Sequence, residues 1–405
     1  MNYEEAQAKL KEFGQEHVLK YWEELSPREK SDLILQINRT DFSVCSAKPG
    51  QEERGSFAPL KAMQLAEIML RSNEFLQLGK ETIKRGKVGA VMLAGGMGTR
   101  LGWSGPKGTY NIGLNNDVFI FQRQIENLLE NVKLTDSWIP LYIMTSEKNN
   151  NETVSFLKQH DYFGYNPDYV TFFMQDMAPA CDREGKVYME SKAAIATSPN
   201  GNGGWFKSME TSNLIPDIHR RGIEWLNVFA VDNVLQRIAD PYFIGAVLSS
   251  GKACGAKVVR KNAPDEKVGV ICLEDGRPSI VEYYELTDEM RDAVDETGSP
   301  AYSFGVILNY LFNVGDLEKT MDKRLPLHVV EKKIPHIDDN GNPVKPESPN
   351  GYKFEQLVLD MIHTFDSCLP YEVVREREFA PVKNATGIDS VESAQSLCLK
   401  NGIML

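Results

Sequence analysis

Paired cysteines and long apolar runs are both missing from this 405-residue sequence. Its six cysteines are scattered and no two have C-x-x-C spacing, which disfavours a zinc knuckle or a thioredoxin-like motif. Apolar runs such as Val88–Ala94 have the length of a strand, far short of the ~20 residues of a membrane span. The N-terminal segment is charged and lacks the apolar core of a signal peptide. We therefore expect a soluble, cytoplasmic protein with reduced thiols.

The short motifs of several large enzyme classes are also absent. The sequence contains no Walker A motif, no G-x-S-x-G and no H-E-x-x-H pattern, which disfavours P-loop ATPases, serine hydrolases and zinc hydrolases. The dinucleotide fingerprint G-x-G-x-x-G fails because Leu101 occupies the place of its third glycine. A nicotinamide-dependent enzyme is therefore disfavoured as well.

The sequence has fewer basic than acidic residues. Lys and Arg number 45 against 57 Asp and Glu, which gives a net charge of −12. A surface of this sign repels nucleic acid and anionic lipid, so we expect neither nucleic acid nor a membrane as a partner. A phosphorylated small molecule remains compatible, because a few Lys, Arg and backbone N–H groups can hold phosphate locally.

The hydrophobic pattern divides the chain into three parts. Residues 1–85 have helical periodicity, and Ser26, Pro27 and Glu29 form a capping pattern that predicts the start of a helix. Residues 86–380 are expected to form an α/β domain, and 381–405 a short C-terminal segment. The turn formers over 334–351 predict a protruding loop or hairpin.

From residue 88 onward, short apolar runs alternate with helical patterns. This alternation predicts an α/β layered fold with a Rossmann-like, mixed but mostly parallel sheet. The expected strands are Val88–Ala94, Pro140–Thr145, Tyr169–Met174, Ile223–Val231, Lys257–Val259 and Val268–Leu273. The expected helices are Leu60–Leu78, Phe119–Val132, Asn151–His160, Pro241–Ser249 and Glu355–Phe365.

A glycine-rich loop follows the first expected strand of the α/β domain. It has the sequence LAGGMGTRLG over 93–102, and a second short motif, PKG, lies at 106–108. Consecutive glycines let the backbone approach a ligand and point N–H groups at anionic oxygens. A tight connection that binds nothing is the alternative, and the two cations of the loop, Arg100 and Lys107, disfavour it.

Two further segments have a composition that suits a binding site. Asp232 follows the expected strand 223–231, where a carboxylate can hold a divalent cation; a turn or helix-cap Asp is the alternative. The segment 199–204, PNGNGG, is flexible enough to fold around a ligand, although a plain surface turn would look the same.

The glycine-rich string and the GWSGPKGTY segment at 102–110 resemble the signature of the eukaryotic-type UDP-sugar pyrophosphorylases. Within that family the sequence is most similar to the UDP-N-acetylglucosamine (UDP-N-acetylhexosamine) pyrophosphorylases. Other similar segments, in the same order, are YFGYNPDYVTFFMQDMAPA (162–180), FAVDN (229–233), VGVICLEDG (268–276) and PNGYKFEQLVLD (349–360). The resemblance covers almost the whole chain and implies a fold of the nucleotide-diphospho-sugar transferase type.

The resemblance implies a role for each of a set of residues. The residues implied to act on the phosphates are Arg100, Lys107 and Lys353. Those implied to bind the nucleotide are Leu93, Ala94, Gly95, Gly96, Gln175, Gly201 and Asp232, with Asp232 also holding Mg²⁺ (or Mn²⁺). Those implied to bind the sugar are Asn202, Gly269, Glu282 and, as a substitute discussed below, Asn309. From local sequence alone, Glu282 and Lys353 could also be solvated residues, and the role of Lys353 rests mostly on the resemblance.

The implied reaction is uridylyl transfer. The phosphate of a hexose 1-phosphate, N-acetylglucosamine 1-phosphate in the first instance, attacks the α-phosphorus of UTP in line, forming a UDP-sugar and releasing pyrophosphate. The attacking oxygen is already anionic near neutral pH, so the reaction requires positioning and charge neutralisation and no general base. The lack of a His/Asp dyad is compatible with this chemistry.

One position departs from the family pattern. Val306 stands where the family usually has an Asn that contacts the hexose, and Asn309 could replace it only if the backbone shifts. A UDP-glucose or broad UDP-sugar pyrophosphorylase therefore stays open, and so does a nucleotide-sugar binding module without turnover. The chain also ends soon after 383–384, where similar enzymes continue into a β-rich domain, and on that ground we expect a monomer.

Overall fold

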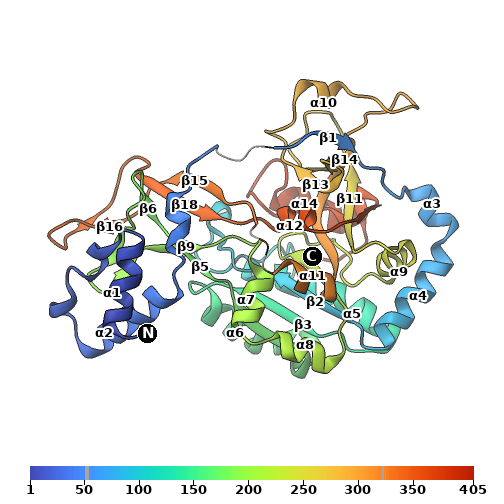
Figure 1. Ribbon diagram of the computed structural model, residues 1–405. Coiled ribbons are helices and arrows are strands. Elements are labelled where there is room, and N and C mark those ends of the chain that lie inside the picture. Colours follow the sequence, from blue (N-terminus) through green and yellow to red (C-terminus); the bar gives the residue numbers. More distant parts are fainter. Residues whose placement is uncertain (51–53, 322, 324) are drawn as a thin grey trace. The chain divides into compact units, whose positions relative to one another are not determined.

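The computed structural model describes residues 1–50, 54–321, 323 and 325–405 (Figure 1). The chain forms two compact units, each built from separate segments. The smaller unit comprises Met1–Glu53, Gln175–Gly204 and Leu325–Leu357, and the larger unit comprises Arg54–Met174, Trp205–Arg324 and Val358–Leu405. The predicted division at residues 85 and 380 follows the order of the chain and stays a prediction.

Four parallel strands lie side by side in the larger unit, in the order β10-β2-β3-β4. They are β2 (Val88–Leu93), β3 (Leu141–Thr145), β4 (Val170–Met174) and β10 (Trp225–Ala230). All residues of β2 and β3 are buried, as expected of strands that are covered on both faces. Each of these strands was predicted from its apolar run.

The same sheet continues with antiparallel pairing. The long strand β14 (Phe304–Asn313) pairs antiparallel with β10, with β11 (Cys254–Arg260) and with β12 (Val270–Glu274). Three further strands complete it: β1 (Phe57–Pro59), β13 (Arg277–Val281) and β19 (Cys368–Glu372). The predicted α/β class with a mixed sheet is confirmed. The sheet is not mostly parallel as expected, because four pairings between its described strands are parallel and five are antiparallel.

Helices pack on this sheet, and one pair approaches very closely. In α4 (Ser72–Lys84) and α9 (Pro241–Ser250), a Cβ on Gly79 would lie 1.9 Å from Pro241 O, and a Cβ on Gly245 would lie 1.9 Å from Phe75 O. The other helices of the larger unit are α3 (Leu65–Leu70), α5 (Ile120–Thr135), α6 (Asn150–Gln159), α7 (Trp205–Thr211), α8 (Ile215–Arg221), α10 (Asp288–Asp292), α11 (Val314–Thr320), α12 (Met361–Thr364), α13 (Arg375–Glu378) and α14 (Val391–Lys400).

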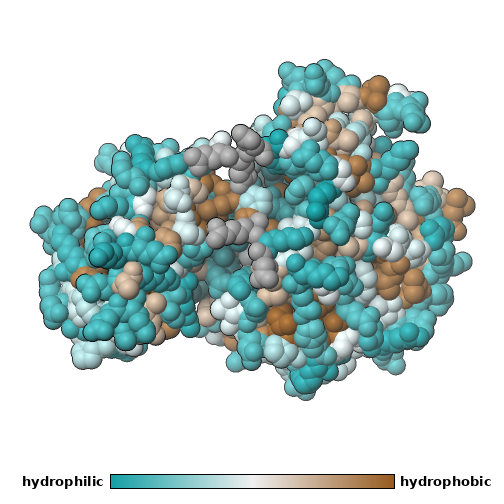
Figure 2. All heavy atoms as spheres, in the orientation of Figure 1, coloured by the Kyte–Doolittle hydropathy of each residue, from teal (hydrophilic) through white to brown (hydrophobic). Residues whose placement is uncertain are grey.

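Two helix predictions were wrong in their extent. The expected helix Leu60–Leu78 is two helices, α3 and α4, because the backbone breaks at Arg71. Leu70 is 87% exposed, and Figure 2 shows hydrophobic residues on the surface near α3. The expected helix Glu355–Phe365 is a strand end at Glu355 followed by a short turn and α12. Strand pairing overrides the helical spacing there.

The smaller unit joins helices to a small sheet. Its helices are α1 (Tyr3–Glu12) and α2 (Pro27–Arg39), and the predicted capping box of Ser26 and Glu29 is present. Strands β15 (His328–Lys332), β18 (Gly351–Glu355) and β6 (Cys181–Asp182) form one sheet. The predicted hairpin is β16 (His336–Ile337) with β17 (Pro343–Val344). Short pairs also form between β5 (Met177–Pro179) and β9 (Thr197–Pro199) and between β7 (Met189–Ser191) and β8 (Ala194–Ile195).

Among the described residues, no helix has both the length and the apolar character that crossing a membrane requires.

Candidate active site

The glycine-rich segment leaves the sheet where β2 ends and folds into a closed turn. Gly98 N–H donates to Gly105 O at 3.0 Å, and Lys107 N–H donates to Gly96 O at 3.1 Å. Gly98 has no room for a side chain, since a Cβ there would lie 2.8 Å from Trp103. The turn therefore places Lys107 beside Gly96, near the start of the loop.

Backbone donors at the start of this loop are available to a ligand. Within the described part of the chain, the N–H groups of Gly95 and Gly96 donate to no protein acceptor. Gly96 is exposed and Gly95 half-buried, whereas Leu93 and Ala94 are 6% and 2% exposed and can offer a ligand little but backbone. Free N–H groups at the carboxyl end of a parallel strand suit an anion or the polar edge of a base.

Two predicted charged residues meet beside this loop. Lys107 Nζ lies 2.8 Å from Asp232 Oδ2, and the two side chains are 17% and 20% exposed. Arg100 is exposed, and none of the described residues forms an ion pair with it. The structure thus brings Lys107 and Asp232 together and leaves the Arg100 guanidinium accessible to an anion.

Strand pairing explains why Asp232 lies here. β10 runs parallel to β2, with Ala230 paired to Leu93, and Val231 N–H donates to Leu93 O at 3.2 Å. Asp232 follows directly, and its own carbonyl accepts from Val382 N–H at 2.9 Å. The glycine-rich loop and Asp232 therefore lie at the same edge of the sheet.

The environment of Asp232 fits a Mg²⁺ ion that is shared with substrate phosphates. Among the described residues, no group of three or more His, Cys, Asp or Glu is placed to hold a metal. Mg²⁺ is commonly held by one or two carboxylates together with substrate phosphates, so a single accessible carboxylate beside anion-binding N–H groups is a suitable donor set.

Two of the predicted sugar-binding residues lie together with the residue that departs from the family pattern. A Cβ on Gly269 would lie 3.7 Å from Glu282 Oε2 and 3.6 Å from Val306 Cγ2. Val306 N–H also donates to Gly269 O at 2.9 Å. The apolar side chain of Val306 and the Glu282 carboxylate therefore both lie beside Gly269.

Asn309 lies elsewhere. It is 0% exposed, and its amide is used inside the protein. It accepts from Asn227 Nδ2 at 2.8 Å and donates to Gln236 Oε1 and to Arg237 O, both at 3.3 Å. The positive φ of Leu308, 53°, belongs to a bulge in β14 that turns Asn309 into the core. The predicted sugar-binding role of Asn309 is wrong, because its carboxamide is buried and bonded inside the core.

An ion-pair network holds the segment that carries Glu282. Arg54 bonds to Glu274 at 3.0 Å and to Glu285 at 2.8 Å, and Glu285 accepts from Glu282 N–H at 2.9 Å. Burial alone would raise the pKa of Glu274, but hydrogen bonds from Arg54, Gly55 N–H and the hydroxyl of Ser279 lower it to about 2. Glu274 therefore stays ionised over the whole neutral range.

The remaining predicted residues belong to the smaller unit and form a group of their own. Gly201 has φ +88°, and a Cβ there would lie 2.3 Å from Gln356 O, so only glycine fits. Asn202 follows in the same loop and Lys353 lies on β18, both half-buried, and Gln175 is 7% exposed. The structure describes this group and the larger unit's group separately.

Two buried polar residues of the larger unit were missed. Gln124, on α5, and Asn149, just before α6, are both 0% exposed and bond to the backbone of the candidate site. Gln124, Asn127 and Asn131 occur at helical spacing within the apolar pattern of the expected helix 119–132. That polar stripe was the signal available in the sequence.

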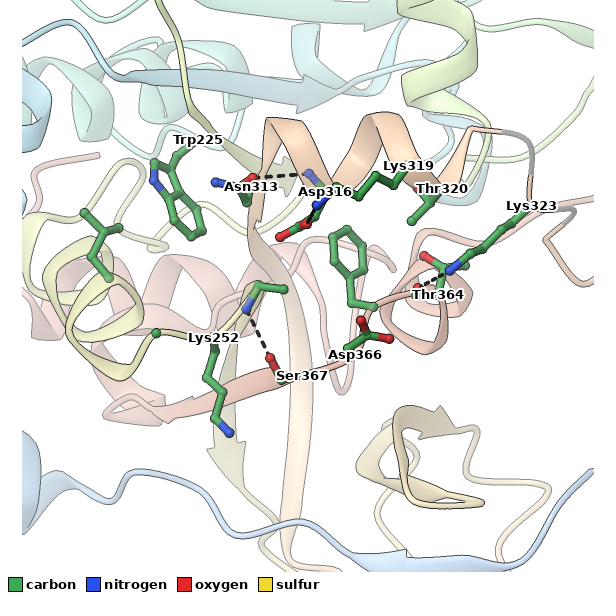
Figure 3. A pocket seen from close by; sticks show the side chains of 14 residues that line it. Trp225, Lys252, Asn313, Asp316, Lys319, Thr320, Lys323, Thr364, Asp366 and Ser367 are labelled. Atoms are coloured by element: carbon green, nitrogen blue, oxygen red, sulfur yellow. Dashed lines mark hydrogen bonds and ion pairs between the residues drawn. The ribbon is translucent and has the colours of Figure 1, made fainter.

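A separate hollow of about 510 Å³ lies at the other end of β10 (Figure 3). Trp225, the first residue of β10, lines it together with Asn313, Phe365 and Ser367. The side chains of Lys319 and Asp316 in this hollow pair with each other at 2.8 Å. None of the predicted site residues lines it.

Comparisons with known proteins cover most of the chain. The family described as UTP--glucose-1-phosphate uridylyltransferase matches residues 53–402. The yeast (Saccharomyces cerevisiae) UDP-N-acetylglucosamine pyrophosphorylase is 36% identical over 96% of this chain and 88% of its own length. The human protein named UDP-N-acetylhexosamine pyrophosphorylase-like protein 1 is 36% identical over 95% of this chain and 81% of its own.

Solved structures agree with these matches. The crystal structure of the uridine diphosphate N-acetylglucosamine pyrophosphorylase from Trypanosoma brucei is 25% identical, with a TM-score of 0.80 over 97% of this chain and 83% of that one. The resemblance inferred from the sequence motifs is confirmed. The chain belongs to the UTP--glucose-1-phosphate uridylyltransferase family.

Proposed function

We propose that the protein is a uridylyltransferase that makes a UDP-sugar and pyrophosphate from UTP and a hexose 1-phosphate, with N-acetylglucosamine 1-phosphate as the sugar substrate. The observation that carries this proposal is the pairing of free N–H groups at Gly95 and Gly96 with the Lys107–Asp232 pair at one sheet edge. The names of the relatives support the choice of sugar.

Each predicted residue except Asn309 takes a role that its chemistry allows. The backbone of Leu93, Ala94, Gly95 and Gly96 packs against the uridine, and Arg100 and Lys107 neutralise the phosphates and the leaving pyrophosphate. The proposed ligands in the smaller unit are Gln175 and Gly201 for the base, Asn202 for the sugar and Lys353 for the sugar phosphate. In the larger unit, Gly269 and Glu282 bind the hexose, with the carboxylate accepting its hydroxyl groups.

The reaction needs no protein base. The anionic phosphate oxygen of the hexose 1-phosphate attacks the α-phosphorus of UTP, and the bond to the β-phosphate oxygen breaks, so that pyrophosphate leaves. Lys107 and Arg100 lower the barrier because negative charge moves onto the leaving group in the transition state. Asp232 would hold Mg²⁺ (or Mn²⁺), which supplies further charge neutralisation at the phosphates when bound.

The proposal also covers the compartment, the oligomeric state and the partners of the enzyme. We propose a cytoplasmic monomer whose partners are UTP, the hexose 1-phosphate, the UDP-sugar and pyrophosphate. The acidic balance of −12 supports the absence of nucleic acid and membrane partners.

A direct test is pyrophosphate release from UTP and Mg²⁺ with a panel of sugar 1-phosphates. Release with N-acetylglucosamine 1-phosphate at the highest kcat/KM is the expected result. Preference for glucose 1-phosphate, or equal use of several sugars, would replace the proposed enzyme with a UDP-glucose or broad UDP-sugar pyrophosphorylase. Binding of UDP-sugar without release from any sugar would indicate a binding module.

A further inference from the structure

The side chain of Asn149 forms hydrogen bonds with the backbone of the glycine-rich loop. Its Nδ2 donates to Ala94 O at 2.9 Å and to Gly96 O at 3.3 Å, the two carbonyls that flank Gly95. Its Oδ1 accepts from Ser146 N–H at 2.8 Å, which ties the carboxamide to the end of β3. The side chain is 0% exposed and uses both of its N–H groups on this loop.

Gln124 makes the same arrangement around Asp232. Its Nε2 donates to Val231 O and to Asn233 O, both at 2.8 Å, and these carbonyls flank Asp232. Its Oε1 accepts from Gln236 Nε2 at 3.1 Å, and it too is 0% exposed. The glycine-rich loop and the turn that carries Asp232 are thus each held by one buried carboxamide.

The planar geometry of the peptide group determines which neighbouring groups these hydrogen bonds orient. In a trans peptide the C=O and the following N–H point in opposite directions within one plane. Holding Ala94 O therefore directs the N–H of Gly95 away from Asn149. Holding Val231 O fixes the peptide plane that enters Asp232, and Val382 N–H already holds the next carbonyl. Asn149 thus sets the direction of the Gly95 N–H, and Gln124 sets the orientation of the peptide group before Asp232.

We propose that Asn149 and Gln124 are positioning residues of the uridylyl-transfer site. Asn149 orients the Gly95 backbone toward the uridine, and Gln124 orients Asp232 and, through the ion pair, Lys107 toward the phosphates. This inference rests on the proposed function. It assigns separate steps to the two residues, since one acts on nucleoside binding and the other on stabilisation of the transition state.

The experiment uses the full chain with each carboxamide removed. Asn149→Ala is expected to raise the Kd of UTP about tenfold or more, with a smaller effect on kcat. Gln124→Ala is expected to lower kcat by about tenfold to a hundredfold while the Kd of UTP changes less than about threefold. Asn149→Ser and Gln124→Met repeat the test with smaller structural change, in case the alanine variants do not fold.

The matched control is Asn131→Ala. Asn131 is 3% exposed, lies on the same helix as Gln124, and donates to Ile238 O at 2.6 Å, away from the site. The loss of the Asn131 carboxamide is expected to lower the unfolding temperature about as much as the loss of the Gln124 or Asn149 carboxamide does. The Kd of UTP by calorimetry, and kcat and KM by pyrophosphate release, should stay within about twofold of wild type. These constants separate positioning from a purely structural role.

The results that would overturn this inference differ from those that would overturn the proposed function. A wild-type chain that binds UTP but releases no pyrophosphate with any sugar 1-phosphate overturns the proposed function, while UTP binding still tests Asn149. A folded Asn149 variant with wild-type affinity for UTP overturns the assignment of Asn149, and a folded Gln124 variant with wild-type kcat overturns that of Gln124. Equal changes in Asn131→Ala overturn both.

Discussion

Lys107 Nζ donates a hydrogen bond to Asp232 Oδ2 at 2.8 Å, and neither side chain is more than 20% exposed. The pair joins the end of the glycine-rich loop to the turn after β10, two segments more than a hundred residues apart in the sequence. Because the opposite charges offset each other, the ammonium and the carboxylate can both be held at the sheet edge before substrate arrives. Two groups proposed to act on the phosphates are therefore pre-positioned by one another.

Replacing Lys107 by Ala tests this pair. We expect kcat to fall by about 10²- to 10³-fold, because one cation is lost where negative charge develops. The free energy of unfolding should change by only about 1 kcal/mol, since the pair is partly exposed and screened by water. Pyrophosphate release and urea unfolding measure the two effects.

The control for this variant is Lys319→Ala. It breaks a pair of similar length, with Asp316 at 2.8 Å, that lies at the other end of β10. Its turnover should match wild type. Near-normal turnover in a folded Lys107→Ala protein would contradict the role assigned to Lys107.

Replacing Val306 by Asn tests the predicted sugar subsite. The new carboxamide would lie beside Gly269, where the hexose is proposed to bind. One added hydrogen bond of about 1.4 kcal/mol corresponds to about a tenfold rise in kcat/KM for the hexose 1-phosphate. The KM of UTP should stay unchanged in the same assay.

Val306→Leu serves as the control, because it adds volume without a donor or acceptor. It should leave the sugar's kcat/KM unchanged or lower it. If Val306→Asn altered the KM of UTP and left the sugar constants as in wild type, the proposed sugar subsite would be misplaced.

The elements that the sequence predicted well are those with a continuous apolar signal. β2, β3 and β10 are buried runs, and the glycine-rich loop and Asp232 could be predicted because each directly follows one of them. β14 was not predicted, although it joins the parallel and antiparallel parts of the sheet. Its partners are set by contacts between distant segments, which no local pattern reports.

The same limit applies to side-chain roles. Gln124 and Asn149 bond to carbonyls of segments more than fifty residues away in sequence, so their function depends on tertiary structure. Asn309 shows the reverse case, a polar residue near a predicted subsite that the bulge at Leu308 turns inward. A residue's spacing in the sequence fixes its face only when the strand stays regular.

Replacing Asn309 by Ala separates a structural from a sugar-binding role. The buried partners Asn227 and Gln236 would each lose a hydrogen bond. We expect a loss of about 1–3 kcal/mol in the free energy of unfolding, measured in urea. The KM of the hexose 1-phosphate should be that of wild type, and a several-fold rise in this KM with unchanged stability would return Asn309 to the sugar site.

The low pKa of Glu274 predicts a pH dependence of stability. In the folded protein this pKa is about 2, below its ordinary value of 4.5, because Arg54, Gly55 and Ser279 stabilise the carboxylate against the cost of burial. A lowered pKa means that the unfolded chain binds the proton more readily. The stabilisation is therefore fully present above about pH 5 and is lost as the pH falls from about 4.5 to 2.

Glu274→Gln removes this titration while keeping the shape of the side chain. Its free energy of unfolding should depend less steeply on pH than that of wild type between pH 5 and 2, although the variant is less stable at pH 7. Glu81→Gln is the matched control, because Glu81 pairs with Arg85 on the exposed face of α4, with the two side chains 58% and 68% exposed. It reports what the loss of an exposed, ion-paired carboxylate does to the slope. Parallel curves for wild type and Glu274→Gln over this range would show that Glu274 does not link folding to acid, because the Arg54 network would then stabilise the protonated and ionised forms equally.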